Sequence, residues 1–174
     1  MTSEVLYTVL VALVGAERLA ELVVAKRNLA WSRAQGGREV GFGHYPFMVA
    51  LHTGLLAGCL LEVWLGHRSF VPALGWPMLA LVVGGQALRW WCIRTLGHQW
   101  NTRVVIVPGL SRVEGGPYRF FSHPNYVAVV VEGVALPLVH TAWITALTFT
   151  LLNAALLTVR IRAENGALAG LATA

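Results

Sequence analysis

The stretch YVAVVVEGVALPLVHTAWITALTFTLLNAALLTVRI, residues 126–161, decides the fold of this chain. A membrane-crossing helix needs roughly 20 mostly apolar residues, so this stretch is too long for one such helix and short for two. Pro137 and His140 interrupt it near its middle. We therefore predict a tight helical hairpin with arms at residues 126–138 and 142–161. The first arm is short for a full crossing of the bilayer.

Three more apolar runs precede this hairpin, at residues 5–24, 47–65 and 70–93. Of the 174 residues, 56% are apolar and 12% are charged, and this charged share is about half that of a soluble globular domain. The mean hydropathy is +0.63, and two cysteines are too few for a disulfide scaffold. The sequence therefore predicts an all-α integral membrane protein with five transmembrane helices. A polar segment, residues 94–125, precedes the hairpin, and we expect residues 1–174 to form one domain.

Positive charge falls on one side of these helices. The chain has 13 Lys and Arg residues against 8 acidic residues, all of them Glu, which gives a net charge of +5. If the N-terminus lies outside, the outer segments hold only Arg68, and cytoplasmic segments are expected to be rich in Lys and Arg. This bias predicts a multi-pass protein of the bacterial inner membrane with a cytoplasmic C-terminus, and no nucleic-acid partner is needed to explain the basic composition. The inner segments would hold Lys26, Arg27, Arg33, Arg38, Arg94, Arg103, Arg112, Arg119, Arg160 and Arg162.

Ionisable side chains inside a predicted span are costly and often functional. Glu17, Arg18 and Glu21 lie one turn apart in the first helix, where Arg18 can pair with Glu21 three residues later. A salt bridge that keeps this helix inserted explains the group as well as a chemical role does. Glu62 lies near the outer end of the second helix, and we expect its carboxylate to reach interfacial water.

Two further polar side chains lie inside predicted helices. Glu132 is about 10 Å along the first arm of the hairpin, so its charge needs a partner or a wet cavity. His52 lies within the first two turns of the second helix, where a single His is more often a packing residue than a chemical group. Together the intramembrane polar groups predict a chamber that opens to the cytoplasm, as in an enzyme or a transporter. No inverted repeat is visible, which favours the enzyme.

The richest motif follows the third predicted helix. Gly115-Gly116-Pro117 is a turn signal, and residues 104–107 could form a short strand. Residues 116–126 read GPYRFFSHPNY, which resembles the G-x-Y-x-x-x-R-H-P-x-Y signature of the isoprenylcysteine carboxyl methyltransferase superfamily. These proteins are integral membrane methyltransferases that use S-adenosylmethionine. Ser122 stands where the signature has Arg.

The resemblance covers nearly the whole chain. Residues 160–164 read RIRAE and resemble the R-x-x-x-E ending of the superfamily, with Asn165 where many members have a second Glu. Upstream residues resemble the bacterial branch that methylates phenolic lipids and alkylpyrones made by type III polyketide synthases. These upstream matches are Glu17-Arg18-Leu19, Arg27-Asn28, Glu39, His44-Tyr45, His52 and residues 103–109.

The resemblance implies a cofactor pocket at the cytoplasmic face, built from residues 94–125 and closed by the C-terminal tail. S-adenosylmethionine carries both charge signs, so Arg119 or Arg160 could hold its carboxylate, and Glu164 could accept from its ammonium or ribose. No Gly-x-Gly-x-x-Gly follows a strand, which argues against a soluble Rossmann site. No metal site is predicted. The candidate cofactor-binding residues are Gln86, His98, Trp100, Gly116, Tyr118, Arg119, His123, Pro124, Tyr126 and Glu164.

Methyl transfer is an in-line displacement, which requires an aligned nucleophile and the exclusion of water. A phenol or enol acceptor benefits from a general base, whereas a carboxylate acceptor does not need one. Glu132, His52 and Glu39 are the candidate bases, and Arg160 could stabilise the oxyanion of the acceptor.

The sequence therefore predicts an enzyme that moves a methyl group from S-adenosylmethionine to an oxygen of a lipophilic acceptor and releases S-adenosylhomocysteine. Two alternatives stay open. One is a membrane reductase or isomerase that acts on an isoprenoid-like or sterol-like lipid with NADPH, and the other is a non-enzymatic lipid-binding protein of the membrane. The sequence does not determine the oligomeric state.

Overall fold

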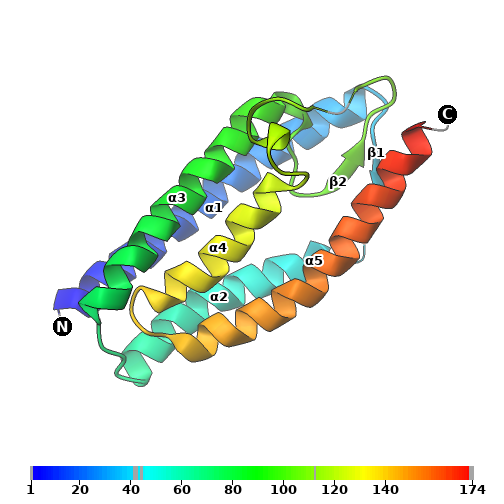
Figure 1. The fold of residues 1–174 in the computed structure, drawn as a ribbon. Coiled ribbons are helices and arrows are strands. Elements are labelled where there is room, and N and C mark those ends of the chain that lie inside the picture. The colour runs from blue at the N-terminus through cyan, green and yellow to red at the C-terminus, as the bar shows by residue number, and fades with distance from the viewer. Residues whose placement is uncertain (1, 41–42, 44, 112, 173–174) are drawn as a thin grey trace.

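The computed structural model describes residues 2–40, 43, 45–111 and 113–172, so His44 and Arg112 lie outside the described residues. Over this part of the chain, five α-helices run along one elongated molecule (Figure 1). They are α1 (Thr2–Ala34), α2 (Tyr45–Leu65), α3 (Pro72–Leu96), α4 (Pro124–Leu138) and α5 (Trp143–Ala172). The predicted hairpin is present as α4 and α5, and Thr141, with a φ of 54°, lies in the turn between them.

The helix ends differ from the predicted ones where the apolar run is shorter than the helix. The first helix was expected to end at residue 24, but α1 continues to Ala34. Helix-favouring residues such as Ala25, Lys26 and Arg27 follow the apolar run, and they sustain helix outside a bilayer as well as inside it. The chain leaves α1 just before Gly36, whose φ of 79° is readily adopted only by glycine.

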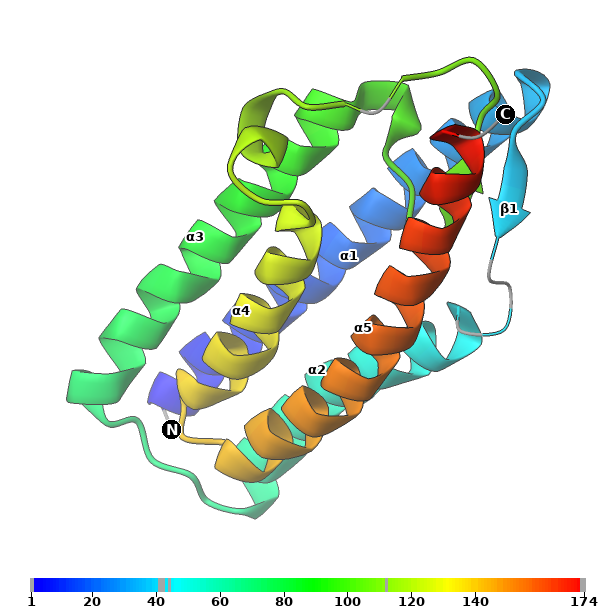
Figure 2. The ribbon, with the colours of Figure 1, turned by 45° about the vertical axis from the view of Figure 1, so that its right-hand side comes forward.

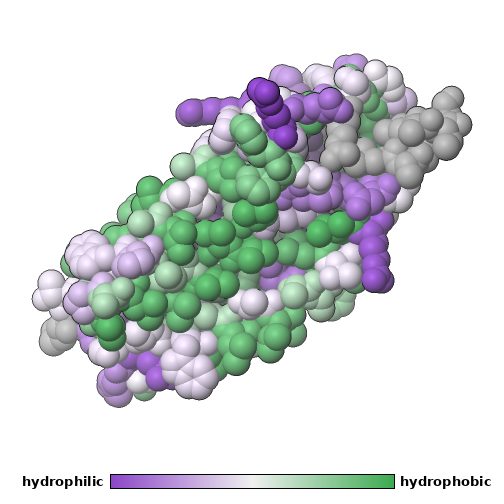
Figure 3. All heavy atoms as spheres, in the orientation of Figure 1, coloured by the Kyte–Doolittle hydropathy of each residue, from purple (hydrophilic) through white to green (hydrophobic). Residues whose placement is uncertain are grey.

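Among the described residues, two helices are long and apolar enough to cross a membrane by length and composition, namely α2 and the part of α5 from Trp143 to Gly166. Five transmembrane helices are therefore not established by length and composition. The helix α4 has 15 residues, which gives it a length of about 22 Å and makes it shorter than a full span. In Figure 3, hydrophobic residues cover the middle of the visible face and hydrophilic residues gather toward its ends, as expected for a membrane protein.

A two-stranded antiparallel sheet corrects the all-α prediction. The strands are β1 (Arg38–Val40) and β2 (Val104–Ile106), with Glu39 opposite Val105. The possible strand at residues 104–107 is thus confirmed, and its partner lies in the connection between α1 and α2. The predicted polar segment also contains two short 3-10 helices, η2 (Gly97–Gln99) and η3 (Gly116–Arg119), which flank β2 in the chain.

The helices pack around a core to which each of the helices α1 to α5 contributes, α3 through Val82. Buried side chains of Val11, Leu55 and Leu136 belong to this core, and the Tyr7 hydroxyl donates a 3.0 Å hydrogen bond to the Leu136 carbonyl. The helix α3 packs along α4. Figure 2 shows α2 and α5 side by side near the α4–α5 turn and diverging toward the end that carries β1. This divergence matters for the cavities described below.

Glu62 closes the molecule at the end near the α4–α5 turn. Its carboxylate accepts hydrogen bonds from Ile144 N (3.1 Å), Thr145 N (2.7 Å), Thr145 Oγ1 (2.8 Å) and Arg68 Nε (3.0 Å). We call this group the Glu62 clasp. The carboxylate caps the free N–H groups at the start of α5, a role that the sequence did not predict, and Glu62 remains half-buried.

Candidate functional site

A buried ion-pair network joins α1, α3 and α4. Arg18 Nη1 lies 2.7 Å from Glu21 Oε2, which confirms the predicted pair three residues apart. Glu132 Oε2 lies 3.0 Å from Arg18 Nη2 and 3.0 Å from Arg89 Nη2. The predicted need of Glu132 for a partner is thus met by two guanidinium groups. Gln86, expected to bind the cofactor, instead accepts a 2.6 Å hydrogen bond from Arg18 in this network.

A second polar group surrounds a cavity of about 130 Å³ at the end that carries the small sheet. We call it the polar cavity. It is formed by the chain from the end of α3 through β2, by η3, and by the start of α4 and the distal part of α5. Its walls are Leu96, Gln99, Trp100, Asn101, Arg103, Val104, Val105, Ile106, Tyr118, His123, Asn125, Tyr126, Arg160 and Glu164.

Hydrogen bonds connect α4 to α5 across this cavity. The buried Arg160 donates from Nε to the Tyr126 hydroxyl (2.9 Å) and from Nη2 to the Thr102 carbonyl (2.6 Å). The Tyr126 hydroxyl in turn donates to a carboxylate oxygen of Glu164. His123 stacks on Tyr126 with ring centroids 5.3 Å apart, and its Nδ1 lies 3.7 Å from Glu164 Oε1. The motif residues and the C-terminal Arg and Glu therefore form one connected group.

Three buried polar atoms of the polar cavity lack a hydrogen-bond partner among the described residues: Trp100 Nε1, Asn101 Nδ2 and Asn125 Oδ1. Buried polar groups in native proteins are normally hydrogen-bonded, so a cluster of exceptions calls for an explanation. Two of these atoms are donors and one is an acceptor. This set fits a ligand that carries both acceptors and donors, such as the carboxylate and the ribose or ammonium of S-adenosylmethionine.

Tyr118 contributes a further donor to the wall of this cavity. Burial raises the pKa of its hydroxyl above the ordinary value for Tyr. The hydroxyl is therefore protonated at physiological pH and can donate a hydrogen bond.

A second cavity of about 230 Å³ adjoins the polar cavity. We call it the chamber. Trp100, Asn125, Tyr126 and Arg160 line both cavities, and the combined volume of the two exceeds the roughly 300 Å³ at which small-molecule pockets begin. Apolar side chains of α1, α2 and α5 form much of the chamber wall. Its polar lining residues outside the shared wall are Arg18, Glu21, His52, Thr53, Arg89, Thr102 and Asn153.

His52 is the candidate base that lines the chamber. Its Nδ1 lies 2.8 Å from the Met48 carbonyl. Because a carbonyl only accepts, Nδ1 carries the proton and Nε2 is left with a free lone pair. The ring stands edge-on to Phe149, with centroids 5.4 Å apart and an interplanar angle of 87°.

The structure places the other two candidate bases away from the chamber wall. Glu132 is held by Arg18 and Arg89 as described, and Glu39 on β1 accepts hydrogen bonds from Arg103 Nη1 at 3.1 and 3.2 Å. Arg103 also stacks over the Tyr45 ring, 4.3 Å from its centroid. Glu39 thereby links the small sheet to the polar cavity, whose wall includes Arg103.

The comparisons with known proteins identify the family. The sequence model of the isoprenylcysteine carboxyl methyltransferase (ICMT) family matches residues 78–170. The chain belongs to the isoprenylcysteine carboxyl methyltransferase family. It is thus a membrane protein of the methyltransferase type that uses S-adenosylmethionine. It is also 37% identical to the uncharacterized protein YpbQ of Bacillus subtilis (strain 168) over 164 residues, which cover 94% of this chain and 96% of YpbQ. No solved structure matches the chain significantly.

The part that matches the ICMT family, residues 78–170, contains every residue that lines the polar cavity. The chamber also uses α1 and α2, which lie before the matched part, and His52 is one of these residues. The likeness to the ICMT family is therefore concentrated on the polar cavity, whereas the chamber is completed by helices that the family model does not match.

Of the ten predicted cofactor residues in this ICMT family member, five line the polar cavity: Trp100, Tyr118, His123, Tyr126 and Glu164. The other five do not. Arg119 is exposed, and His98 is exposed and stacks on Trp31 at 5.1 Å. Gly116 has a φ of 56° and packs against Thr95, where a side chain would clash, so its role is to shape η3. Pro124 begins α4, and Gln86 lies in the ion-pair network described above.

Sequence reasoning missed several residues of the site. Asn101, Arg103 and Asn125 line the polar cavity, and Asn153 lines the chamber. Asn153 is 2% exposed and lies in the apolar α5, and its Oδ1 has no partner within the described part of the chain. The sequence could have identified Asn153, because it is a polar residue inside an apolar span, as Glu132 is in α4.

Proposed function

We propose that this protein transfers a methyl group from S-adenosylmethionine to an ionisable oxygen of a lipophilic acceptor, as one domain over residues 1–174. The observation that carries the proposal is the shared wall of the two cavities. Arg160 and Tyr126 line both the polar cavity, which suits a cofactor, and the chamber, which suits an amphiphilic acceptor. A donor and an acceptor bound on the two sides of this wall would meet there.

The residues of the polar cavity suit the parts of the cofactor. Trp100 Nε1 and Asn101 Nδ2 would donate to its carboxylate, and Asn125 Oδ1 would accept from its ammonium or ribose. Glu164 and His123 would complete the site beside Tyr126. The bound cofactor supplies an electrophilic methyl group. This chain's residues bind and orient it and exclude water from the reacting atoms.

His52 is the proposed general base. Its free Nε2 would take the proton from a hydroxyl of the acceptor, and the Nδ1–H bond to Met48 keeps the ring in the required tautomer. The guanidinium of Arg160 would stabilise the oxygen as it becomes negative. A base in this position favours a phenol or enol acceptor, because a carboxylate has no proton to remove. In this proposal Glu132 positions α1, α3 and α4 through its two Arg partners.

The proposed topology has five transmembrane helices, with the N-terminus outside and the polar cavity at the cytoplasmic face of the bacterial inner membrane. The charge bias of the sequence and the exposed apolar side chains of α1, α2, α3 and α5 support this arrangement. Cysteines placed at Thr2 and at Glu114, tested with membrane-impermeant thiol reagents on intact cells, should react only at Thr2. Reaction at Glu114 in intact cells would reverse the topology.

Cofactor binding tests the methyltransferase directly. The protein in nanodiscs should bind S-adenosylhomocysteine with a micromolar-range dissociation constant by calorimetry, corresponding to about 8 kcal/mol. NADPH should not compete. Membranes incubated with methyl-labelled S-adenosylmethionine and alkylresorcinols, alkylpyrones or prenylcysteines should label an acceptor with a hydroxyl. NADPH binding in place of S-adenosylhomocysteine would support a reductase, and tolerance of Tyr126→Phe and Glu164→Ala in every assay would support a non-enzymatic lipid-binding protein.

A substitution pair tests the base. His52→Asn should lower kcat by about 100-fold or more, with unchanged affinity for S-adenosylhomocysteine. In a plot of kcat against pH, the decrease toward acidic pH should disappear. His98→Asn is the matched control, because His98 is exposed and lies outside both cavities. Full activity of His52→Asn, with loss of activity in Glu132→Gln at unchanged stability, would assign the base to Glu132 instead.

A further inference from the structure

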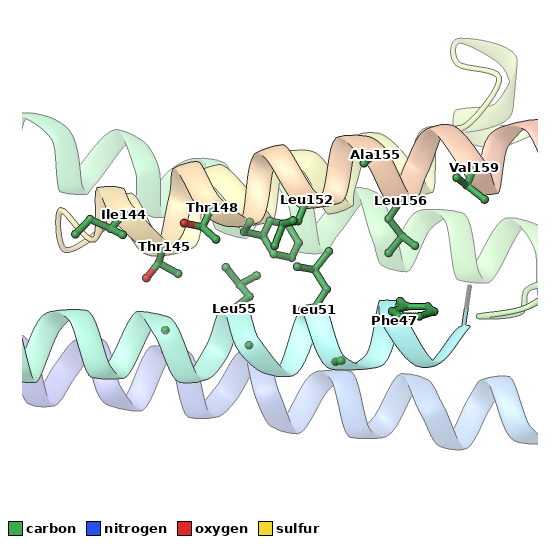
Figure 4. Close-up of a pocket in the computed structure, with 14 residues that line it drawn as sticks. Phe47, Leu51, Leu55, Ile144, Thr145, Thr148, Leu152, Ala155, Leu156 and Val159 are labelled. Carbon is green, nitrogen blue, oxygen red and sulfur yellow. The ribbon is translucent and has the colours of Figure 1, made fainter. Parts of the chain in front are cut away.

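A third cavity lies between α2 and α5, and its residues are apolar apart from two threonines. It measures about 710 Å³ and has the form of a groove, as Figure 4 shows. Leu51 and Leu55 of α2 and Leu152 and Leu156 of α5 point into the space between the two helices. Ala50, Gly54 and Gly58 of α2 leave this space open, because they carry little or no side chain. We call this cavity the α2–α5 groove.

The groove is closed at the end near the α4–α5 turn. A Cβ atom on Gly58 would lie 3.0 Å from Thr145, which shows how closely α2 and α5 approach there. The Glu62 clasp holds Thr145 in place just beyond this contact. Toward the opposite end the two helices diverge, and there Phe47 and Val159 line the groove (Figures 2 and 4).

The groove adjoins the chamber. Leu156 lines both cavities, and Phe149, which lines the groove, contacts the ring of His52, which lines the chamber. On α2 the two cavities use alternating residues, with Leu51 and Leu55 on the groove and His52 and Leu56 on the chamber. The groove therefore runs beside the proposed reaction site on the neighbouring face of the same two helices.

We propose that the α2–α5 groove holds the hydrocarbon chain of the acceptor and that its closed end limits the length of the chain. This inference rests on the proposed function, because it places the head of the acceptor in the chamber. An amphiphile bound in this way has its head at the polar end and its chain along the helices, which is how it already lies in the leaflet that faces the site. The groove then selects a single chain of limited length.

The helices give a scale for this limit. Phe47 and Gly58, the first and last groove residues of α2, are separated by about 16 Å of helix axis. An extended chain advances about 1.2 Å per bond, so roughly 13 carbon atoms reach from the open end to the contact between Gly58 and Thr145. Longer chains would have to bend out of the groove into the bilayer.

A helix of a second copy is the competing occupant, because Ala50, Gly54 and Gly58 recur every four residues, as at many helix contacts in membranes. Such a contact requires the partner backbone to approach the small residues closely. Here Leu51, Leu55 and Leu152 project into the space beside them. A helix is about 10 Å wide with its side chains, whereas an alkyl chain fits between these leucines. The lining therefore favours the chain.

Photo-crosslinking tests the occupant without requiring turnover. The probes are two long-chain alkylphenols, one with a diazirine at the chain end and one with a diazirine next to the ring, added to the protein in nanodiscs. The end-labelled probe should react mainly near Gly58, Thr145 and Thr148, and the ring-proximal probe near Phe47 and Met48. Equal labelling of all lipid-facing helices by both probes would overturn the groove assignment. Groove-specific labelling without S-adenosylhomocysteine binding would retain the groove and overturn the proposed function.

A variant pair tests the length limit. Gly54→Leu fills the groove halfway, and no described atom lies within 4 Å of the position its Cβ would take, so the helix itself is not strained. Alkylphenols of increasing length are used to compete with the end-labelled probe. The longest competitor that binds well should lose at least about tenfold in affinity relative to a short one, because at least two methylenes lose their site.

Gly84→Leu is the matched control, since Gly84 is equally open on α3 and lies outside the groove. It should leave the length preference unchanged, and both variants should bind S-adenosylhomocysteine like the native protein, which shows that they fold. An unchanged length preference in Gly54→Leu would overturn the proposal. A Gly54→Cys variant that forms disulfide-linked dimers in membranes would also overturn it and assign the groove to a second copy.

Discussion

Both ends of the helix bundle carry polar groups, but these groups differ in how many of their hydrogen bonds are made within the protein. At one end, the Glu62 carboxylate accepts four hydrogen bonds, from Arg68, Ile144 and Thr145. The donors are all within the protein, and two of them are the free N–H groups at the start of α5. The Glu62 carboxylate is therefore fully paired without a ligand, although the two ring nitrogens of the nearby buried His140 have no hydrogen-bond partner in the described part of the chain and line none of the three cavities.

At the other end the polar groups are only partly satisfied. Tyr126, Arg160 and Glu164 bond to one another, yet Trp100 Nε1 and Asn125 Oδ1 beside them have no partner in the described part of the chain. The contrast distinguishes two uses of polar groups in an apolar protein. A fully paired carboxylate stabilises the fold, whereas buried groups that line a cavity and have no partner, as Trp100 Nε1 and Asn125 Oδ1 do, can be paired by a ligand.

The largest effect is expected at Arg160, which belongs to both cavities. Arg160→Met removes the donor to Tyr126 and to the Thr102 carbonyl and the proposed stabilisation of the acceptor oxygen. Methyl transfer should fall by roughly 10²- to 10³-fold, measured with labelled S-adenosylmethionine. Arg162→Met is the control, because Arg162 is exposed on the same helix. Equal losses in the two variants would mean that the charge at this end, and not the site, is what matters.

The Glu62 clasp should show the opposite pattern. Glu62→Gln keeps the size of the side chain but replaces one accepting oxygen with a donor, so charged hydrogen bonds to Arg68 and to the start of α5 are lost. Thermal unfolding in detergent should show a loss of about 2 kcal/mol, while the affinity for S-adenosylhomocysteine stays the same. If Glu62→Gln unfolded like the native protein but bound S-adenosylhomocysteine more weakly, Glu62 would contribute to ligand binding and not to stability.

The smallest effects are expected for two asparagines near Trp100, one whose amide nitrogen has no hydrogen-bond partner in the described part of the chain and one whose amide nitrogen has two. Asn101→Ala removes an amide without a partner, so stability should change little, whereas the affinity for S-adenosylhomocysteine should fall about fivefold by calorimetry, the value of one hydrogen bond. Asn28→Ala removes an amide that donates to the Gly97 and Trp100 carbonyls at 3.0 and 2.7 Å. It should lower stability by about 2 kcal/mol. If Asn101→Ala were the less stable of the two, the unpaired amide would not be reserved for a ligand.

The apolar runs of the sequence predict the helices well but not where they end. The apolar run reflects the thickness of the bilayer and stops at residue 24, whereas α1 continues to Ala34, supported by helix propensity and by the packing of Ala25 and Asn28 against the segment after α3. The strand β1 has three residues, of which only Val40 is apolar, and its existence depends on pairing with β2, about 65 residues away in the chain. A contact of this kind leaves no local pattern.

The motif predicts the central residues of the polar cavity but not all the residues around them. Tyr126, His123, Arg160 and Glu164 were identified together through the resemblance, and the structure connects them by hydrogen bonds and a ring stack. Asn125 lies inside the same motif, but the sequence does not show that its carbonyl oxygen is buried without a partner. That property belongs to the three-dimensional packing of several segments, so only the structure identifies it.

In the proposed topology, the shortness of α4 determines how far a lipid acceptor would be lifted out of the bilayer to react. At about 22 Å, α4 is roughly 8 Å shorter than the hydrocarbon layer of a typical bilayer. In the proposed topology its first turn, with Tyr126, therefore lies below the level of the headgroups. A site at the membrane surface would pull about six methylenes of the acceptor into water, at about 0.8 kcal/mol each, or about 5 kcal/mol in total. With the site recessed in this proposed arrangement, extraction of the acceptor would add little to the barrier for the proposed methyl transfer.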